Sequence, residues 1–543
     1  MKKFLIVAFA ALGFVACNDN NIDDVTNGGL LGEVETSYIA VNLNAADNTR
    51  AAGDTYQDGL DAERAVKAAY FFFFKNDGTA FPVTGSPATS DGGTVNWISA
   101  NLNNIGSDTP NVSDIKDAVL VLSTYKGTYP AQIVAVINWV PAADTTYDLD
   151  DLYAATNIIG AGGGFVMSNA VYSDGTNAVV GTPLETSDIY TSPADALANP
   201  ITIHVERIAA KVTVTANGVA NNRYFVKTAN ISGVDTDVYV QVTGWELYND
   251  FTQSKLLKYI NPAWSDLGFT WNDQPFFRSY WAQSLAISEI IDNAFPTTFP
   301  LELGVTANVN SENYVANTYT YVGENTLYDA ATDNTHDCTK VIIKAKLQKK
   351  MSESVYEDLP MTRWYTTYYA TLNDLLTAVV NTIKYQYAWD NGSSYEYITP
   401  GDLTVVKDGN WVKFQLSAPA ESKNWYVSDG VGYTPKTTAE INANLATIEK
   451  ALYYEGSETL YAVDIAHSAY INPGIHAGDY GVVRNHIYNV ILKSFGGFGS
   501  PVYVPESGPG FVYPETSDTG EYVSAEVRIL SWRLVSQEVD VQP

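Results

Sequence analysis

Hydrophobic and polar residues alternate along most of this chain, in short segments that end at turn residues. Residues 403–416 place Val405-Val406 and Trp411-Val412 on either side of Asp408-Gly409, which is the pattern of a β-hairpin. Comparable strand-like stretches occupy 64–75, 118–122, 131–140, 201–215, 238–247, 319–323 and 340–347. This period-two pattern predicts an all-β fold.

Two segments have helical periodicity instead. Residues 372–385 are apolar at 372, 375, 376, 379 and 380, and residues 438–452 begin at a capping Thr438. We expect these few short helices to lie over a sheet. The polar stretch Ala216-Asn217-Gly218 is the preferred domain boundary, which predicts a β-sandwich at 51–216 and a larger, decorated one at 217–500.

The N-terminus has the pattern of an export signal. Lys2-Lys3 precede an apolar run over 4–15, and Ala16 precedes Cys17. We predict a lipoprotein signal peptide at 1–16 and lipidation of Cys17, palmitate included. The alternative is an ordinary signal peptide followed by a coincidental cysteine.

A second strand-like segment follows at 36–44, with Ile39, Val41 and Leu43 on one face. The small, polar stretch after it contains Arg50, followed by Ala51. An arginine in a loop is accessible to a protease, so 17–50 is a possible propeptide with a removable strand. The simpler interpretation is an ordinary surface arginine, and the segment alone does not decide between them.

The last segment, 501–543, is set apart from both domains. Residues 500–520 are rich in proline, glycine and serine, as in an extended linker. Apolar residues then alternate with polar ones at Val523, Ala525, Val527, Ile529, Trp532, Leu534, Val539 and Val541. A strand of this kind needs an edge to pair with. It either folds back on its own domain or is offered to a neighbour.

Composition narrows the classes of partner. The chain has 37 tyrosines, 46% hydrophobic residues and a formal net charge of −30. Nucleic acid and anionic lipid surfaces would be repelled, so neither is expected as a partner. Only two cysteines are present, and lipidation of Cys17 leaves Cys338 without one to pair with.

The chain carries no recognisable catalytic motif, so we predict no enzyme, no catalytic residue, no metal and no cofactor. Walker-type phosphate loops, His-Glu-x-x-His, Gly-x-Ser-x-Gly and Cys-x-x-Cys are all missing. His336-Asp337-Cys338, the histidines 467 and 476, and the pair Asp150-Asp151 are weak candidates for metal or acid–base chemistry. We expect each to be structural.

Several segments, taken in their order, resemble the fimbrillins, the pilins of Bacteroidales-type (type V) fimbriae. The strand Val-Arg-Asn-x-x-Tyr lies at 483–488 and the turn Gly-x-Pro at 499–501. Residues 205–212, 321–325 and 525–534 are similar to further strands of the family. Residues 48–54 resemble the maturation site of the large fimbrillins of the short (minor) fimbrium.

The resemblance implies two tandem transthyretin-like β-sandwich domains and a C-terminal donor strand. An Arg-specific surface protease would cut between Arg50 and Ala51 and release the lipid anchor together with the Ile39/Val41/Leu43 strand. The donor strand of another subunit would fill the vacated place. The chain would be a shaft subunit of a head-to-tail homopolymer, with tip and anchor subunits as further partners.

The implied role is adhesion, coaggregation and biofilm formation through host or bacterial receptors. The location would be a cell-surface fimbrium, reached through an outer-membrane lipoprotein precursor that alone contacts the membrane. One rival is a surface glycan-binding β-sandwich lipoprotein, which would keep its N-terminal segment. A second rival is a secreted hydrolase, which would need converging acid and base residues.

Overall fold

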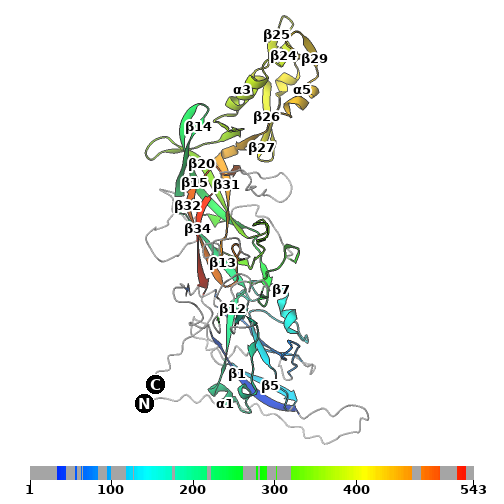
Figure 1. Ribbon diagram of the computed structural model, residues 1–543, viewed down its shortest axis with the longest axis vertical. Coiled ribbons are helices and arrows are strands. Elements are labelled where there is room, and N and C mark those ends of the chain that lie inside the picture. Colours follow the sequence, from blue (N-terminus) through cyan, green and yellow to red (C-terminus); the bar gives the residue numbers. More distant parts are fainter. Residues whose placement is uncertain are drawn as a thin grey trace, which may run out of the picture.

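The computed structural model describes residues 34–44, 56–57, 63, 65–83, 95–99, 118–125, 127–173, 178–216, 222–260, 277–278, 282–289, 301–302, 319–467, 478–501 and 523–532. The described residues form an elongated molecule (Figure 1). Strands dominate and helices are few, so the prediction of an all-β fold is confirmed. None of the helices in these ranges has the length and apolar character needed to span a bilayer.

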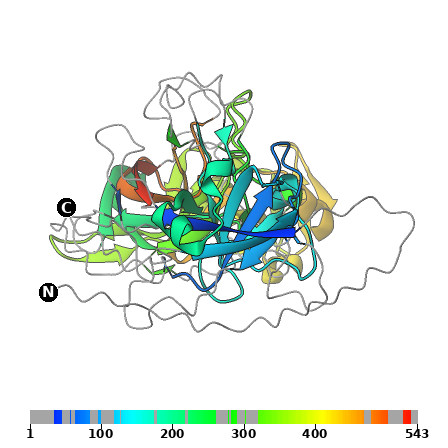
Figure 2. The same cartoon turned by 90° about the horizontal axis from the view of Figure 1, so that it is seen from below.

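An N-terminal sheet forms one end of the molecule, and its strands follow the order β4-β3-β6-β8-β12-β1-β5, with β11 beside β6. Their bounds are β1 (Val34–Asn44), β3 (Ala69–Phe74), β4 (Trp97–Ser99), β5 (Ala118–Tyr125), β6 (Gln132–Ile137), β8 (Met167–Asn169), β11 (Thr182–Pro183) and β12 (Ile201–Arg207). The run Phe71–Phe74 in β3 is completely buried, so both faces of this strand are covered. The short helix α1 (Pro193–Ala198) packs against β1. Figure 2 views this end and shows the blue β1 across it.

Small elements border this sheet. They are β7 (Ala155–Asn157) with β16 (Gln253–Lys255), the group β9 (Tyr172–Ser173), β10 (Ala178–Val179) and β17 (Phe277–Arg278), and the 3-10 turns η3 (Leu149–Tyr153), η4 (Thr186–Asp188) and η7 (Ile287–Glu289). The β7–β16 pair joins the N-terminal part of the chain to a segment that follows the long strand β15 (Val234–Tyr248).

A second core lies between two further sheets. The smaller sheet has the order β19-β13-β32-β34-β2, with β2 (Tyr56–Gln57), β13 (Ala209–Ala216), β19 (Tyr319–Gly323), β32 (His486–Phe495) and β34 (Val523–Trp532). Alternate residues of β13 and β32, such as Val212, Val214 and Val490, pack against Val240 and Ile343 from the larger sheet. This arrangement is a β-sandwich.

The larger sheet follows the order β26-β27-β30-β22-β23-β14-β15-β20-β31-β33, with β18 and β21 at its margins. Besides β15, its bounds are β14 (Arg223–Ile231), β18 (Leu301–Glu302), β20 (Lys340–Lys350), β21 (Tyr356–Asp358), β22 (Met361–Trp364), β23 (Thr367–Tyr369), β26 (Leu403–Asp408), β27 (Trp411–Leu416), β30 (Ala451–Tyr454), β31 (Glu458–Asp464) and β33 (Ser500–Pro501), with turn η9 (Glu455–Ser457) between β30 and β31. The predicted hairpin is confirmed: Asp408 pairs with Trp411, and Gly409 between them has a positive φ of 68°.

A third core lies at the end of the molecule opposite the N-terminal sheet (Figure 1). It consists of α3 (Leu372–Ile383), α4 (Ala418–Glu421), α5 (Thr438–Leu445), turn η8 (Pro400–Asp402), and a sheet β25 (Tyr395–Tyr397), β24 (Tyr387–Asp390), β28 (Trp425–Ser428) and β29 (Tyr433–Lys436). The two predicted helices are present but shorter than their patterns. The cap of α5 is Thr437, not Thr438, and Leu452 belongs to β30.

The chain passes from the first core to the second without a loop. β12 and β13 are separated only by Ile208, and Ala209 packs in the first core while Ala210 packs in the second. The two strands therefore form one nearly continuous element through the junction of the first and second cores. The domain limits at 216/217 and 500/501 stay a prediction, as does the division into two sandwiches.

Candidate functional site

The strand β1 fills an interior position of the N-terminal sheet. It runs antiparallel to β5 from Val34 opposite Tyr125 to Val41 opposite Ala118, and parallel to β12 from Val41 to Asn44. In addition, the backbone N–H of Tyr38 donates to the carbonyl oxygen of Tyr190 at 2.8 Å, and that of Tyr190 donates back at 2.9 Å. We call this position, bounded by β5 and β12, the β1 seat.

The β1 seat is apolar. Ile39 and Val41 are completely buried in the first core, as expected from their alternation, and Leu122 and Ile203 of the flanking strands are equally buried. The side chain of Leu43, the third predicted face residue, lies outside the described residues. Burial of an aliphatic side chain contributes about 1.5–3 kcal/mol, so β1 contributes substantially to this core.

Within the described ranges, β5 pairs with β1 alone. Without β1, the described part of β5 has no ladder partner, and β12 presents an open edge. A replacement strand can restore both ladders only if it runs antiparallel to β5 and parallel to β12. The β1 seat therefore fixes the polarity of whatever occupies it.

The C-terminal strand β34 folds back on its own sheet, which is one of the two alternatives left open by the sequence. It runs antiparallel to β32, from Val523 opposite Phe495 to Ser531 opposite His486. Its outer neighbour is β2, where Tyr56 pairs with Ser531 in parallel. The side chains of Val523, Ala525, Val527, Ile529 and Trp532, and all of Leu534, Val539 and Val541, lie outside the described residues.

The predicted lipidation and cleavage positions cannot be placed. Cys17, Arg50 and Ala51 all lie outside the described residues, so these assignments stay predictions. The structure nevertheless places the elements on either side of Arg50. β1 precedes it in the N-terminal sheet, and β2 follows it beside β34.

Three of the segments that carry the family resemblance meet at the junction of the first and second cores. Arg484, which is fully buried, forms an ion pair with Glu324 through its Nη2 and Oε2 at 3.0 Å. Asn325 and Val482 exchange backbone hydrogen bonds at 2.8 Å in both directions, and the N–H of Asn485 donates to the carbonyl of Ala209 at 2.7 Å. Segments far apart in sequence thus fix the junction.

Gly323 is required because two backbone segments approach each other closely at the junction. A Cβ at this position would lie 2.1 Å from the carbonyl oxygen of Gln253, and the N–H of Gly323 donates to the carbonyl of Phe251 at 2.5 Å. Only glycine allows this contact. Glycine at the variable position of the Tyr-Val-x-Glu-Asn segment therefore has a structural reason in this chain.

A buried carboxylate that sequence reasoning missed, Glu63, holds the N-terminal segment to the same junction. Its Oε1 lies 2.8 Å from Nζ of Lys211 and also accepts a hydrogen bond from the Tyr321 hydroxyl, while its carbonyl accepts from Nε of Arg207 at 2.8 Å. Burial and the bond to Glu63 raise the pKa of Tyr321, which keeps the phenol protonated as a donor. The sequence around Glu63 gave no indication that this residue is buried, because its partners are distant in sequence.

The remaining candidates for chemistry have structural roles. Cys338 is completely buried, and burial raises the pKa of its thiol to about 12. His467 lies against His486, with ring centroids 5.5 Å apart, and its Nδ1 is 2.9 Å from the hydroxyl of Tyr488. His476, the expected neighbour of His467, lies outside the described residues. Among the described side chains, no group of three or more potential metal ligands occurs.

The acidic pair Asp150-Asp151 lies in the turn η3. Asp151 accepts a hydrogen bond from the backbone of Asp148 at 2.8 Å, as part of a capping box. Asp151 therefore serves the local backbone, as expected for a structural residue.

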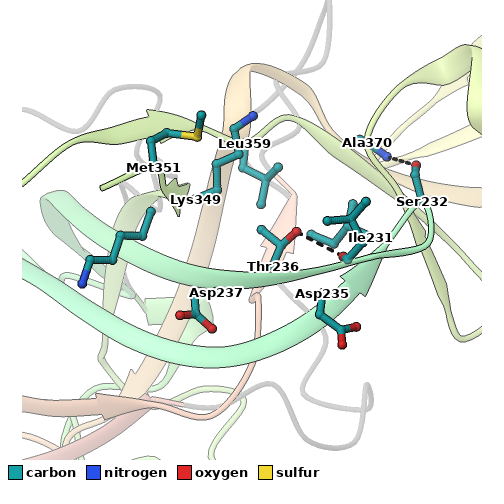
Figure 3. A pocket seen from close by; sticks show the side chains of 11 residues that line it. Ile231, Ser232, Asp235, Thr236, Asp237, Lys349, Met351, Leu359 and Ala370 are labelled. Atoms are coloured by element: carbon teal, nitrogen blue, oxygen red, sulfur yellow. Dashed lines mark hydrogen bonds between the residues drawn. The ribbon is translucent and has the colours of Figure 1, made fainter. Parts of the chain in front are cut away.

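A hollow of about 560 Å³ lies beside the β14–β15 hairpin (Figure 3). Ile231 and Leu359 supply apolar walls, and the hydroxyl of Ser232 accepts a hydrogen bond from the backbone of Ala370 at 2.9 Å. The carboxylates of its rim, Asp235 and Asp237, accept hydrogen bonds from Asn230 at 2.9 Å and Thr228 at 2.6 Å, their neighbours across the hairpin. These acids support the turn, and the hollow belongs to the second sandwich rather than to the β1 seat.

A comparison with protein families finds a match in the C-terminal part of the chain. Residues 452–538 match the family described as major fimbrial subunit protein type IV, fimbrillin, C-terminal. This range contains β32 and β34 and also Arg484 and Asn485, which contribute to the junction. No curated protein matches the chain.

Solved structures show a loose likeness over nearly the whole chain. A putative cell adhesion protein from Parabacteroides distasonis is 10% identical with a TM-score of 0.40, over 92% of this chain and 98% of that one. A fimbrilin from Porphyromonas gingivalis is 12% identical with a TM-score of 0.35, over 92% and 98%. The tip fimbrial protein Mfa3 from Porphyromonas gingivalis is 13% identical with a TM-score of 0.26, over 92% and 100%.

These scores lie below 0.5, so the assignment depends on the C-terminal family match. That match covers the Val-Arg-Asn-x-x-Tyr strand and the terminal strand, two of the segments that carry the resemblance. The C-terminal part of this chain, residues 452–538, is therefore similar to the C-terminal region of the fimbrillins, the major subunits of fimbriae.

Proposed function

We propose that this chain is a shaft subunit that polymerises by donor-strand exchange after a protease has removed its N-terminal strand. Fimbrial subunits polymerise with other fimbrial subunits, and the proposal concerns how this one does so. The observation that carries it is the β1 seat. The strand that precedes the predicted cleavage position supplies the completely buried Ile39 and Val41 and is the described partner of β5.

The steps of the proposal follow the sequence predictions. The precursor is exported and lipidated at Cys17, an Arg-specific protease cuts between Arg50 and Ala51, and β1 leaves with the anchor. The vacated seat then has apolar side chains and open backbone edges on β5 and β12. A second copy of this chain fills it with its C-terminal strand.

Strand directions support this exchange. β12 and β13 run toward and through the junction, and β32 is parallel to β13, so β32 runs away from the junction. β34 returns toward the junction, antiparallel to β32. If β34 detaches and the linker 502–522 carries it outward, its direction reverses and becomes that of β12. In a neighbour of the same orientation, this is the polarity that the β1 seat requires.

The reach of the linker is sufficient for this movement. An extended chain advances about 3.3 Å per residue, so the 502–522 linker alone can span roughly 70 Å. Donor and acceptor are different surfaces of one subunit, and the contact is therefore head-to-tail and builds an open filament. Tip and anchor subunits would end this filament, and host or bacterial receptors would bind it in adhesion, coaggregation and biofilm formation.

The test is the N-terminal sequence of polymerised surface material beside that of the precursor. An N-terminus at Ala51 in the polymer supports the proposal. Replacement of Arg50 by alanine should trap a lipid-anchored monomer, and replacement of Arg64, which lies after Glu63, should not. Normal polymer from the Arg50→Ala chain would place the cut elsewhere and contradict the assignment.

A glycan-binding surface lipoprotein is the second candidate, and one feature favours it. The outer face of the β24–β25–β28–β29 sheet carries exposed tyrosines, among them Tyr395 and Tyr433, which stack with ring centroids 3.9 Å apart. Tyrosine combines an apolar ring with a polar hydroxyl, as contact surfaces require. This candidate predicts that the working protein retains lipidated Cys17, so the same N-terminal sequence decides between the two.

A further inference from the structure

The four-stranded sheet β25-β24-β28-β29 has two different faces, and it lies at the end of the molecule opposite β1 (Figure 1). The ladders place Tyr387, Trp389 and Trp425 on the face toward the third core, where Tyr387 and Trp425 are buried. The opposite face carries Tyr395, Tyr397, Tyr426 and Tyr433, together with Asp390. We call this surface the tyrosine face.

The rings of the tyrosine face form one connected layer. Tyr395 and Tyr433 belong to the two edge strands, β25 and β29, yet their rings stack across the sheet with centroids 3.9 Å apart. Tyr426 meets the ring of Tyr395 edge-on at 5.0 Å. A hydrogen bond with Tyr397 raises the pKa of Tyr433. Ala388 of the same face is completely buried beneath the layer. Rings held in this way lose little conformational entropy when a partner binds.

The layer is accessible to a partner. Tyr395, Tyr397 and Tyr433 are 42%, 38% and 37% exposed. The neighbouring Tyr385 is 69% exposed, and its ring lies edge-on to that of Tyr397 at 5.2 Å, which extends the layer beyond the sheet. A contiguous group of exposed aromatic side chains marks a contact surface, since each tyrosine offers both an apolar ring and a hydroxyl.

Asp390 places a negative charge within the tyrosine face. It lies opposite Tyr395 in the β24–β25 ladder, and its Oδ1 accepts a hydrogen bond from the N–H of Gly392 at 2.8 Å. Burial, followed by the nearby Tyr426 and Asp390, raises the pKa of Tyr395, so the field of the carboxylate reaches that side chain. Aromatic rings beside a carboxylate are a combination that attracts a cation.

This carboxylate has no cationic partner within the part of the chain that the structure describes. The same is true of Asp429, in the turn between β28 and β29. By contrast, Asp402, on another side of the third core, forms an ion pair with Lys423 at 2.5 Å. The two carboxylates beside the tyrosine face are therefore available to an external cation, in a chain whose formal net charge is −30.

Aromatic residues at the margins of this sheet already hold cations. Nζ of Lys423 lies 4.2 Å from the centroid of the Trp389 ring on the core side. Nζ of Lys384 lies 5.8 Å from that of Tyr385, at the border of the tyrosine face. The same kind of contact on the rings of the face itself would have to come from another molecule.

We propose that the tyrosine face is a docking site for a basic polypeptide of another molecule, whose arginine or lysine side chain lies on the rings and pairs with Asp390. Arginine fits best, because its planar guanidinium stacks on aromatic rings and forms a forked pair with a carboxylate. A neutral glycan would gain from the rings but not from the charge of the carboxylates, and an anionic ligand would be repelled. The use of this site in adhesion rests on the proposed function, whereas binding itself requires neither the cut nor strand exchange.

Binding of a synthetic peptide to the full chain tests the proposal. The probe is a short fluorescent peptide of alternating serine and arginine, and its partner has the uncharged citrulline in place of each arginine. Fluorescence anisotropy at physiological ionic strength measures both. We expect saturable binding of the arginine peptide, and binding of the citrulline peptide that is weaker by about tenfold or more. Equal binding of the two peptides would overturn the proposal.

Two variants of the face separate the rings from the charge. The double change Tyr395→Leu/Tyr433→Leu removes two rings but keeps apolar cover over Ala388. Asp390→Asn removes the charge and keeps an oxygen that accepts the hydrogen bond from Gly392. Each should weaken binding of the arginine peptide about tenfold. Asp390→Asn leaves the packing unchanged, so it decides the question even if the leucine variant does not fold.

Matched controls address the acidity of the whole chain, which attracts any basic peptide. Tyr365 is 64% exposed in the turn between β22 and β23, and Glu421 is exposed in α4. Tyr365→Ala and Glu421→Gln should leave binding of the arginine peptide unchanged within about twofold. An equal loss from these controls would show binding by overall charge and would overturn the proposal, as would unchanged binding by both face variants.

Two further measurements on the same variants separate other occupants and the proposed function. Binding of cellohexaose, a neutral oligosaccharide, that is lost in the leucine variant but not in Asp390→Asn would overturn the proposal and assign the face to a glycan. Self-association of the chain that is lost in both face variants would assign it to a second copy and overturn the proposal as well. Face variants that polymerise normally but no longer bind the arginine peptide support the docking site. Native chain that binds the peptide but forms no polymer supports the docking site and refutes strand exchange alone.

Discussion

Glu246 is a residue that works against the stability of the second sandwich at neutral pH. Burial and the nearby Asp250 raise the pKa of its carboxyl to about 7, and its Oε2 has no hydrogen-bond partner among the described residues. The folded chain holds this proton up to about pH 7, whereas the unfolded chain loses it near 4.5. Stability therefore falls as pH rises through this window.

The change Glu246→Gln should remove this dependence. We expect the variant to unfold at a higher temperature than the native chain at pH 8, and at nearly the same temperature at pH 4. Thermal unfolding at the two pH values measures the difference. An exposed carboxylate of the same sheet, Glu357, serves as the control, and Glu357→Gln should change the unfolding temperature little. A constant offset for Glu246→Gln at both pH values would contradict the titration.

Cys338 should be chemically silent in the folded protein. Its thiol is completely buried and its pKa is raised to about 12, so the reactive thiolate is scarce and shielded. In the chain that begins at Ala51 it is the one cysteine. Labelling with a thiol reagent at pH 8 should be at least roughly 100-fold slower in the native protein than in denaturant. Rapid labelling under native conditions would show that this region opens.

At the scale of the element, local patterns predicted what local interactions determine. The 319–323 strand and the 403–416 hairpin follow from alternation and turn residues, and both are confirmed. The pattern over 438–452 overran the helix, because Leu452 has helical spacing yet pairs in β30. The junction could not be derived in this way, since Glu63, Lys211 and Arg484 find partners more than a hundred residues away.

If the proposed cut takes place, β1 is the element whose contribution to stability is lost from the mature chain. Ile39→Ala should lower the stability of the precursor by about 2–4 kcal/mol, because it leaves a cavity in the first core. The exposed neighbour Thr36→Ala should cost little. Denaturant unfolding of precursor and cut forms measures both. Since the residue departs with the propeptide, the cut forms of the two variants should be identical to native, and a surviving difference would mean that β1 stays bound.

At the scale of the whole molecule, the β1 seat and the C-terminal strand β34 belong to different sheets. Their proposed roles, accepting and donating a strand, should therefore be separable by mutation. Removal of residues from Glu521 onward should leave a cut chain that accepts a strand but donates none. Alone it should remain monomeric, and mixed with the native chain it should shorten filaments by occupying one end. Native gel ladders and electron microscopy of mixtures at several ratios measure both effects, and filaments from the truncated chain alone would contradict the donor assignment.

A single substitution refines this test, because truncation removes linker residues and strand together. The alternation over 523–532 places Val527 on the apolar face and Ser524 on the other. Val527→Asp should suppress polymer formation, since a buried charge without a partner is costly, whereas Ser524→Asp should not. Equal loss from both would indicate that the backbone ladder alone decides the exchange. Loss from Val527→Asp only would show that the vacated β1 seat selects the entering strand by its apolar side chains, which take the place of those of β1.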